Sequence, residues 1–148
     1  MGFVKNDTFN ATLSDGPFKF ENFSLTYLVA HINGVLVPSI PYTPDYSKDR
    51  YVREFYGLYK YTNQDEGIPS LKVDYKQYKD DYCLYAFDLS PDGSMGAESG
   101  ILSLTQSGNI KIEAKFASSL NSPIHMIILG QYDNLIKIDK FRAVKIDF

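Results

Sequence analysis

The sequence is poor in the residues that usually build reactive centres. It holds one cysteine, two histidines and no tryptophan in 148 residues. A single cysteine excludes an intramolecular disulfide and a zinc site made of thiolates. No carboxylate stands near His31 or His125 at a fixed short spacing that would orient an imidazole for catalysis or metal binding. We interpret both histidines as structural and expect no cofactor and no metal.

Long apolar runs and catalytic fingerprints are also missing. No apolar run approaches the roughly 18 residues of a membrane helix, and the first ten residues lack the cationic and apolar regions of a signal peptide. The sequence contains no P-loop, G-x-S-x-G, H-E-x-x-H or dinucleotide-binding pattern. We therefore expect no enzyme, no membrane span and no classical secretion, with assembly inside the cell.

Positive charge is not concentrated anywhere along the chain. The 15 Lys and Arg residues are scattered, and the 18 Asp and Glu residues bring the formal net charge to -3. Direct binding of nucleic acid depends on a basic patch or stripe. We expect no direct nucleic-acid ligand.

One thiol and one group of carboxylates remain as candidates for chemistry. Cys83 stands in an apolar run, which is typical of an inert buried thiol. The carboxylates do not have the spacing of an EF-hand loop, and turn and loop preferences account for them. The group consists of Asp80, Asp81, Asp88 and Asp92.

Aromatic residues are abundant, and this excess favours strands. The chain has 12 Tyr and 10 Phe. The clearest local pattern is a hairpin, in which alternating residues 23–32 lead into Asn33-Gly34 and then into residues 35–37. Asn and Gly tolerate the positive φ of a type I′ turn. Because proline cannot donate to a β ladder, the prolines that follow predict the end of the strand and an extended loop over residues 38–50.

Residues 51–59 predict one short amphipathic helix. Val52, Phe55, Tyr56 and Tyr59 follow one another at spacings of three and four. Residues 60–80 are polar and contain breakers, so we expect them to be irregular.

Further runs of strand length are separated by turn signals. Residues 110–116 alternate most cleanly, with Ile110 and every second residue after it directed inward. Residues 124–129 are apolar on both faces and predict a strand buried in the middle of a sheet. The other expected strands cover residues 82–89 (closed by a turn at 90–93), 101–104, 135–139 and 144–148.

These patterns predict a single all-β domain over residues 1–148. About seven or eight short antiparallel strands, with one short helix in a long loop, are typical of a jelly-roll β-sandwich. The long connection over residues 38–80 favours a jelly roll over a simple meander.

Tyrosines crowd this long connection and suggest a contact surface. Tyrosine combines a large apolar ring with a polar tip and is enriched at protein interfaces. The alternative is that the rings cap the open end of the sandwich. The interface candidates are Tyr42, Tyr46, Tyr51, Phe55, Tyr56, Tyr59 and Tyr61.

Several phrases, in their order and spacing, resemble a known family over nearly the whole chain. They are Gly16-Pro17-Phe18-Lys19-Phe20, Asn33-Gly34, Val37-Pro38, Pro44-Asp45, Val52-Arg53-Glu54-Phe55, the run from Tyr82 to Asp92, the run from Gly108 to Glu113, the run from Tyr132 to Asp139, and Asp147-Phe148. The sequence resembles the C-terminal part of the uncharacterised hexon-like protein family of Maverick (Polinton) and adintovirus-like elements.

The resemblance implies a major capsid protein of the double jelly-roll lineage. In that lineage two sandwiches stand side by side, and three copies form a pseudo-hexagonal capsomer. Family members are considerably longer, so this chain resembles a fragment or a single-domain relative. We expect a structural protein of a virion, with neighbouring capsid subunits as its partners. The alternative is a jelly-roll module that binds a glycan or a receptor.

Overall fold

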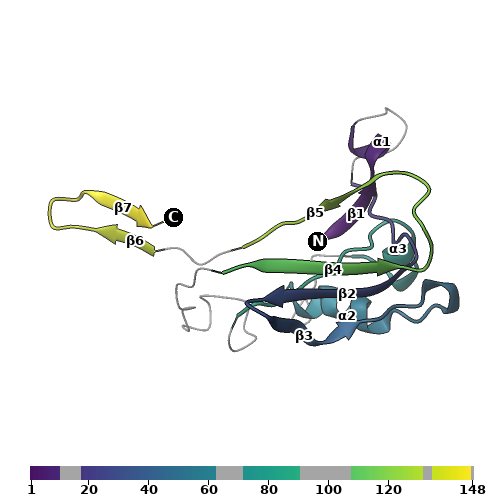
Figure 1. Cartoon of the computed structure of the whole chain (residues 1–148). Helices are drawn as coiled ribbons and strands as arrows, with labels where there is room; N and C mark the ends of the chain where they lie inside the picture. The colour runs from purple at the N-terminus through teal and green to yellow at the C-terminus, as the bar shows by residue number, and fades with distance from the viewer. Residues whose placement is uncertain (11–17, 63–71, 91–107, 132–134, 148) are drawn as a thin grey trace.

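The computed structural model describes residues 1–10, 18–62, 72–90, 108–131 and 135–147 (Figure 1). The expected strand at 101–104 and most of the expected turn at 90–93 lie outside these residues. The elements are β1 (Gly2–Lys5), α1 (Asn6–Phe9), β2 (Leu25–Ile32), β3 (Val35–Tyr42), the 3-10 helix η1 (Tyr46–Lys48), α2 (Val52–Lys60), α3 (Tyr75–Asp80), β4 (Ile110–Phe116), β5 (Ile124–Ile127), β6 (Leu135–Ile138) and β7 (Val144–Asp147).

The described strands form three small antiparallel sheets. Their orders are β3-β2-β4, β1-β5 and β6-β7. The prediction of a mostly β chain with antiparallel strand pairing is therefore confirmed. The sheets are unclosed, so the jelly-roll arrangement stays a prediction.

The predicted hairpin is confirmed and forms the centre of the largest sheet. Asn33 and Gly34 have φ values of 49° and 86°, as the turn requires. Leu28 and Val29 in the middle of β2 are fully buried, and β2 has a partner strand on each side. The side chain of Asn33 also accepts a hydrogen bond from the backbone N–H of Asn109 at 3.2 Å, which ties the turn to the start of β4.

The expected loop over residues 38–50 is wrong in its first part, because β3 continues to Tyr42. Within the described sheet β3 pairs only with β2, and an edge strand tolerates proline, whose missing N–H can face away from the ladder. The register also shifts between the Ala30–Val37 pair and the Leu28–Tyr42 pair. This bulge takes up the stretch that contains Pro38 and Pro41.

The expected strand at 82–89 is absent. The segment makes only isolated bridges, from Tyr82 to Phe20 and from Leu84 to Gly2. Successive residues bond to different segments, because the N–H of Cys83 donates to Phe20 and that of Tyr85 donates to Met1. Cys83 and Tyr85 are still buried, whereas Tyr82 and Leu89 at the two ends of the run are exposed. The hydrophobic run therefore indicated a buried centre correctly and strand pairing wrongly.

Strand β5 is not a buried central strand as expected. It pairs only with β1 among the described strands, and Met126 and Ile128 are exposed. Leu129, just beyond it, is 92% exposed. Strand β4 lies where it was predicted, but Ile110 at its start is exposed instead of inward.

The chain has more helices than the single one expected. Helix α2 confirms the prediction for residues 51–59, whereas α3 lies in the region expected to be irregular. A capping box starts α3: Asp74 accepts from the N–H of Gln77 at 2.7 Å, and the side chain of Gln77 accepts from the N–H of Asp74 at 3.0 Å.

The buried face of α2 is shifted from the predicted one. Glu54, Gly57 and Leu58 are buried, whereas Val52 and Tyr56 are exposed. Gly57 is required at its position, because a Cβ there would stand 2.8 Å from the Tyr42 hydroxyl. The pattern of large apolar residues could not reveal this, since the buried positions include a glycine and a glutamate.

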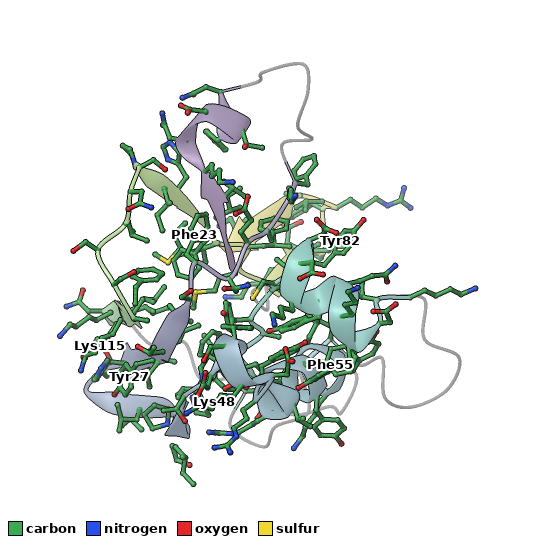
Figure 2. The ribbon with its side chains drawn as sticks, turned by 90° about the vertical axis from the view of Figure 1, so that its right-hand side faces the viewer. Phe23, Tyr27, Lys48, Phe55, Tyr82 and Lys115 are labelled. Carbon is green, nitrogen blue, oxygen red and sulfur yellow. The ribbon has the colours of Figure 1, made fainter. Side chains whose placement is uncertain are left out.

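The core lies between the β2 face, α2, α3 and the segment around Cys83 and Tyr85. Eleven buried residues from these parts and from β1, β3 and η1 form one cluster, and six of them are tyrosines or phenylalanines. Phe55 on α2 packs against this cluster, whereas Lys115 and Tyr27 lie together on β2 and β4 (Figure 2). Among the described side chains of the hairpin formed by β6 and β7, none belongs to the cluster, and the hairpin projects away from it (Figure 1).

Candidate functional site

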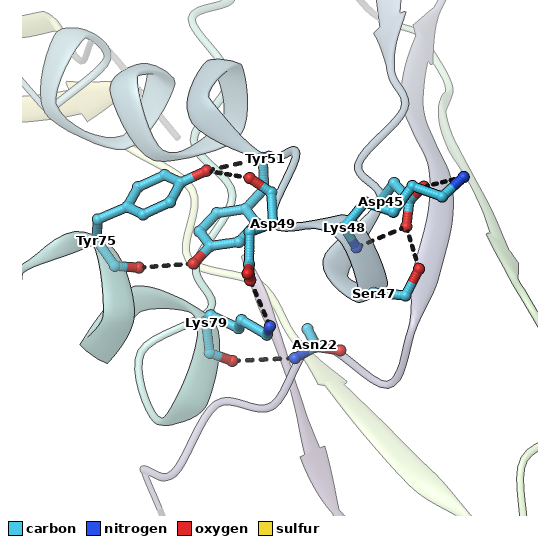
Figure 3. Close-up of polar contacts among 8 residues, drawn as sticks. All are labelled: Asn22, Asp45, Ser47, Lys48, Asp49, Tyr51, Tyr75 and Lys79. Atoms are coloured by element: carbon cyan, nitrogen blue, oxygen red, sulfur yellow. Dashed lines mark hydrogen bonds and ion pairs between the residues drawn. The ribbon is translucent and has the colours of Figure 1, made fainter.

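A stack of tyrosine rings joins the 3-10 helix, α2 and α3. The Tyr51 ring lies 4.1 Å from the Tyr75 ring and 5.1 Å from the Tyr46 ring, measured between centroids. The Tyr51 hydroxyl donates to the Tyr75 carbonyl at 3.1 Å, and the Tyr75 hydroxyl donates to the Asp49 carbonyl at 2.7 Å (Figure 3). Burial raises the pKa of Tyr51 to about 12. These hydrogen bonds and ring contacts hold the 3-10 helix, α2 and α3 together within residues 38–80, the long connection that the sequence predicted.

An ion pair and two side-chain hydrogen bonds link the surface residues around this tyrosine stack. The Lys79 ammonium lies 2.5 Å from the Asp49 carboxylate, and this contact raises the pKa of Lys79. The side chain of Asn22 donates to the Lys79 carbonyl at 3.0 Å (Figure 3). The hydroxyl of Ser47 donates to Asp45 at 2.6 Å and lowers the pKa of that carboxyl.

Cys83 lies inside a buried hydrogen-bonded group of tyrosines. Its Sγ is 3.1 Å from the Tyr46 hydroxyl and 3.2 Å from the Tyr85 hydroxyl, and those two hydroxyls are 2.7 Å apart. Burial raises the pKa of the Cys83 thiol to about 11 and raises the pKa values of Tyr46 and Tyr85 further above their usual range. The thiol is therefore protonated and enclosed at neutral pH, which is the opposite of an activated nucleophile.

Glu54 is the one buried carboxylate of α2. Burial raises the pKa of the Glu54 carboxyl. Hydrogen bonds from the backbone N–H groups of Glu54 and Thr43 lower it, but their effect is smaller. The neighbouring Arg53 turns outward, where its guanidinium lies 5.1 Å from the centre of the Tyr42 ring and donates to the carbonyls of Ile40 and Pro41. Arg53 thus holds the end of β3 against the start of α2.

The structure separates the seven interface candidates into three groups. Tyr42, Tyr46 and Tyr51 are core residues whose rings have no free surface for a partner. Phe55, Tyr59 and Tyr61 are partly buried; the Tyr59 hydroxyl bonds to the backbone of Val73. Tyr56 alone among the seven is mostly exposed, at 55%. Three of the seven rings belong to the core, and contact with a partner stays a prediction, for which Tyr56 is the most exposed candidate.

Tyr56 belongs to a small exposed apolar surface, which we name the α2 patch. Val52 is one helical turn before Tyr56 on the same face of α2 and is 65% exposed. Ile40, 69% exposed, lies on β3 where Arg53 joins that strand to α2. The α2 patch consists of Val52 and Tyr56. The spacing pattern put Val52 and Tyr56 on the same apolar face of the helix, and the structure exposes both of them.

The second exposed apolar surface is the hairpin of residues 135–147, which we name the arm. Asp139 shapes its turn by accepting from the N–H groups of Phe141 and Ala143 at 2.8 and 2.9 Å. Strand pairing sets Ile138 opposite Val144, and Lys137 opposite Lys145. Four large apolar residues of the arm are between 58% and 79% exposed: Ile136, Ile138, Phe141 and Val144. The sequence predicted both strands. The alternation of apolar and polar residues could not show that the described apolar side chains of these strands are exposed.

Both histidines lie on strands and contact polar side chains. His31 on β2 lies 3.4 Å from the carboxylate of Glu113 on β4, and the hydrogen bond from Lys115 is the main cause of the lowered pKa of Glu113. His125 on β5 lies 2.6 Å from the side-chain oxygen of Asn6. Across the described parts of the chain, no group of three or more His, Cys, Asp or Glu residues could hold a metal ion.

One pocket of about 260 Å³ lies between β3, the end of α2 and the segment before residue 90. Asp88 is its most unusual residue. Its Oδ1 accepts from the N–H and the hydroxyl of Ser90, whereas the buried Oδ2 has no hydrogen-bond partner among the residues that the structure describes. The pocket is lined by Val37, Pro38, Ser39, Lys60, Tyr61, Phe87 and Asp88. The other carboxylates considered above are at the surface near α3, except Asp92, which lies outside the described residues.

None of the described helices has the length and apolar character needed to cross a membrane. Comparison of the chain with protein-family models, with curated proteins and with solved structures gives no match in any of the three.

Proposed function

We propose that this protein is a structural subunit that assembles with other copies, and that the arm is the observation that carries this proposal. A two-stranded hairpin is at best marginally stable alone in water and needs a surface to cover its apolar side. Within the described chain, β6 and β7 contact each other far more than any other element. A neighbouring subunit would supply the missing surface.

The exposed apolar side chains of the arm would gain free energy if a partner covered them. Burying a large aliphatic or aromatic side chain contributes about 1.5–3 kcal/mol, and the arm offers four such residues. Association costs on the order of 4–15 kcal/mol in lost freedom of motion. The arm therefore needs a well-fitting acceptor, or several simultaneous contacts as in a closed assembly.

We assign the assembly to the capsid type because of the resemblance to hexon-like proteins. On this proposal the antiparallel sheets belong to a jelly-roll sandwich, the aromatic core makes that sandwich rigid, and the chain is located in a virion. Its partners are neighbouring capsid subunits, and a trimeric capsomer is the expected unit.

Size-exclusion chromatography with light scattering over a range of concentrations tests this proposal. We expect an oligomer whose interface buries more than about 1,000 Å² in total. The double change Ile136→Lys and Ile138→Lys should produce a monomer, because each change puts a charge on the apolar side of the arm. Ile110→Lys is the matched control, since Ile110 is exposed to a similar degree but lies on β4. A wild-type chain that stays monomeric at high concentration contradicts the proposal.

The pocket beside Asp88 favours a second candidate, a glycan-binding or receptor-binding module. Aromatic rings for stacking on a sugar and a carboxylate oxygen without a partner stand together there. A glycan array would test this candidate: a hit that Tyr61→Ala and Asp88→Ala both abolish supports it, and a hit that survives both changes rejects this pocket as the site.

A further inference from the structure

We infer that the pocket between β3, the end of α2 and Asp88 binds one acidic sugar residue, such as a hexuronic acid. In this binding mode Lys60 contacts the carboxylate of the sugar, and Asp88 accepts a hydrogen bond from a ring hydroxyl. The inference rests on the second candidate function, the glycan-binding module, and adds to it the chemical class of the ligand. It does not depend on assembly through the arm.

The first step is the size of the pocket and its apolar side. Its volume of about 260 Å³ lies below the range of about 300–1,000 Å³ that is typical of sites for drug-sized ligands. A single sugar ring therefore suits it better than a longer chain. Val37, Pro38 and Phe87 form the apolar part of the lining. The C–H face of a sugar ring can pack on these side chains.

The second step is that contacts with the rest of the fold hold the walls of the pocket. The Phe87 ring packs edge-on against the buried Tyr42 ring, with 5.5 Å between the ring centres. The Tyr42 hydroxyl donates to the Ala86 carbonyl at 3.2 Å. On the other side, the N–H of Tyr61 donates to the Gly57 carbonyl at 2.9 Å, at the end of α2. A site that is already formed loses less conformational freedom when a ligand binds.

The third step is that two opposite charges line the pocket without meeting. Lys60 and Asp88 both belong to the lining. Among the described residues, no ion pair joins Lys60 to Asp88 or to another carboxylate. The Lys60 ammonium lies 5.5 Å from the centre of the Tyr61 ring, which also lines the pocket. A ligand with an anion at one end and hydroxyl groups at the other matches both charged groups.

The fourth step is the hydrogen-bonding capacity of Asp88. Its Oδ1 already accepts twice from Ser90, whereas no described residue donates to the buried Oδ2. A buried acceptor without a partner is unfavourable, so a donor that reaches Oδ2 gains free energy. Because the terminal torsion of an aspartate is broad, a small rotation of the carboxyl turns Oδ2 toward the pocket. A hydroxyl brings one hydrogen to this single oxygen, whereas an ammonium brings three that all need acceptors.

Ligand-observed NMR with three related sugars tests the inference on the full chain. Glucuronate carries a carboxylate, glucose is neutral, and glucosamine carries an ammonium. We expect glucuronate to bind with a Kd on the order of 1 mM. Glucose and glucosamine should bind about fivefold more weakly, because neither forms the ion pair with Lys60.

Three variants assign the binding to the pocket. Lys60→Gln should weaken glucuronate binding about fivefold and leave glucose binding unchanged. Lys76→Gln is the matched control, because Lys76 is exposed on α3 and does not line the pocket. Asp88→Ala should weaken the binding of both sugars. Circular dichroism and thermal melting check that the variants fold, with Asp88→Asn as the milder replacement.

Four other outcomes overturn the inference in distinguishable ways. Equal binding of glucuronate and glucose, with loss of both in Asp88→Ala, rejects the acidic class and leaves the glycan-binding candidate intact. Tighter binding of glucosamine means that Asp88, and not Lys60, selects the ligand. Glucuronate binding that survives both Lys60→Gln and Asp88→Ala takes place outside this pocket. If none of the three sugars binds the wild-type chain, the glycan-binding candidate fails as well.

Discussion

At the residue scale, the hydroxyl groups of the core are as important as its rings. Tyr46, Cys83 and Tyr85 satisfy one another in a space that water does not reach. A buried polar group that loses its partner costs about 1–3 kcal/mol. The tyrosine-rich core is therefore sensitive to changes that preserve every ring.

Replacement of Tyr85 by phenylalanine should lower the free energy of unfolding by about 1–2 kcal/mol. The change removes the group that bonds to both Tyr46 and Cys83 and leaves the packing of the ring intact. Urea denaturation measures the effect. Tyr56→Phe is the control and should stay within about 0.5 kcal/mol of wild type, because Tyr56 is exposed. Equal losses for the two variants would refute the buried network.

High pH should destabilise the protein through Cys83. Burial raises the pKa of its thiol from the ordinary value of 9.0 to about 11 in the folded chain. Because the folded state binds this proton more tightly, its contribution is complete below pH 9 and is lost as the pH rises toward 11. The loss amounts to about 2–3 kcal/mol. Thermal melts from pH 8 to pH 11 measure it.

Cys83→Ala provides the comparison for this experiment. The variant should be less stable at all pH values, because the change leaves a cavity, but its stability should fall less steeply between pH 9 and 11. The buried tyrosines also have raised pKa values and retain part of the alkaline dependence. Identical slopes for the two proteins would show that the thiol is not the group responsible.

At the scale of elements, α3 shows how a short helix arises in a stretch without a strong apolar period. It spans six residues, and its capping box supplies partners for N–H groups that would otherwise have none. The Tyr78 side chain then anchors the helix in the core, and its hydroxyl donates to the Leu84 carbonyl at 3.0 Å. The capping box and the buried Tyr78 ring stabilise α3 in place of an apolar face along the helix.

Asp74→Ala should destabilise the protein by about 1 kcal/mol. The change removes the side chain that accepts from the N–H of Gln77. Asp80→Ala, at the other end of α3, is the matched control and should have little effect, since a carboxylate there faces the negative end of the helix. Chemical denaturation of both variants checks the difference, and a larger effect for Asp80→Ala would contradict the role of the capping box.

At the scale of the whole molecule, the hydrophobic core and the proposed contact surface lie in different parts of the chain. Among the side chains that the structure describes, none from the arm belongs to the core cluster. A chain that ends at Gln131 should therefore melt within a few degrees of wild type at low concentration, yet lose self-association. Calorimetry and light scattering measure the two properties on the same sample. A large drop in melting temperature would mean that the arm is part of the fold.

The sequence was most informative where the structure depends on neighbouring residues. The Asn33-Gly34 turn, the alternation of β4 and the strands of the arm are local patterns, and each was predicted where it lies. Helix α2 was also predicted, but the face that it buries was not. Gly57 faces the core because the Tyr42 hydroxyl lies close to it, and Glu54 is buried on the same side of the helix.

Pairing and exposure were decided only by the tertiary structure. Residues 82–89 and 124–129 have equally apolar sequences, yet Cys83 and Tyr85 are enclosed while Ile128 and Leu129 are exposed. The tyrosines of the long connection look alike in the sequence, and only the packing of α2 against α3 and β3 buries Tyr51 while it leaves Tyr56 outside. The physical reason is that the periodicity of a segment reports which of its faces is apolar, whereas the surface that covers that face comes from distant parts of the chain or from another molecule.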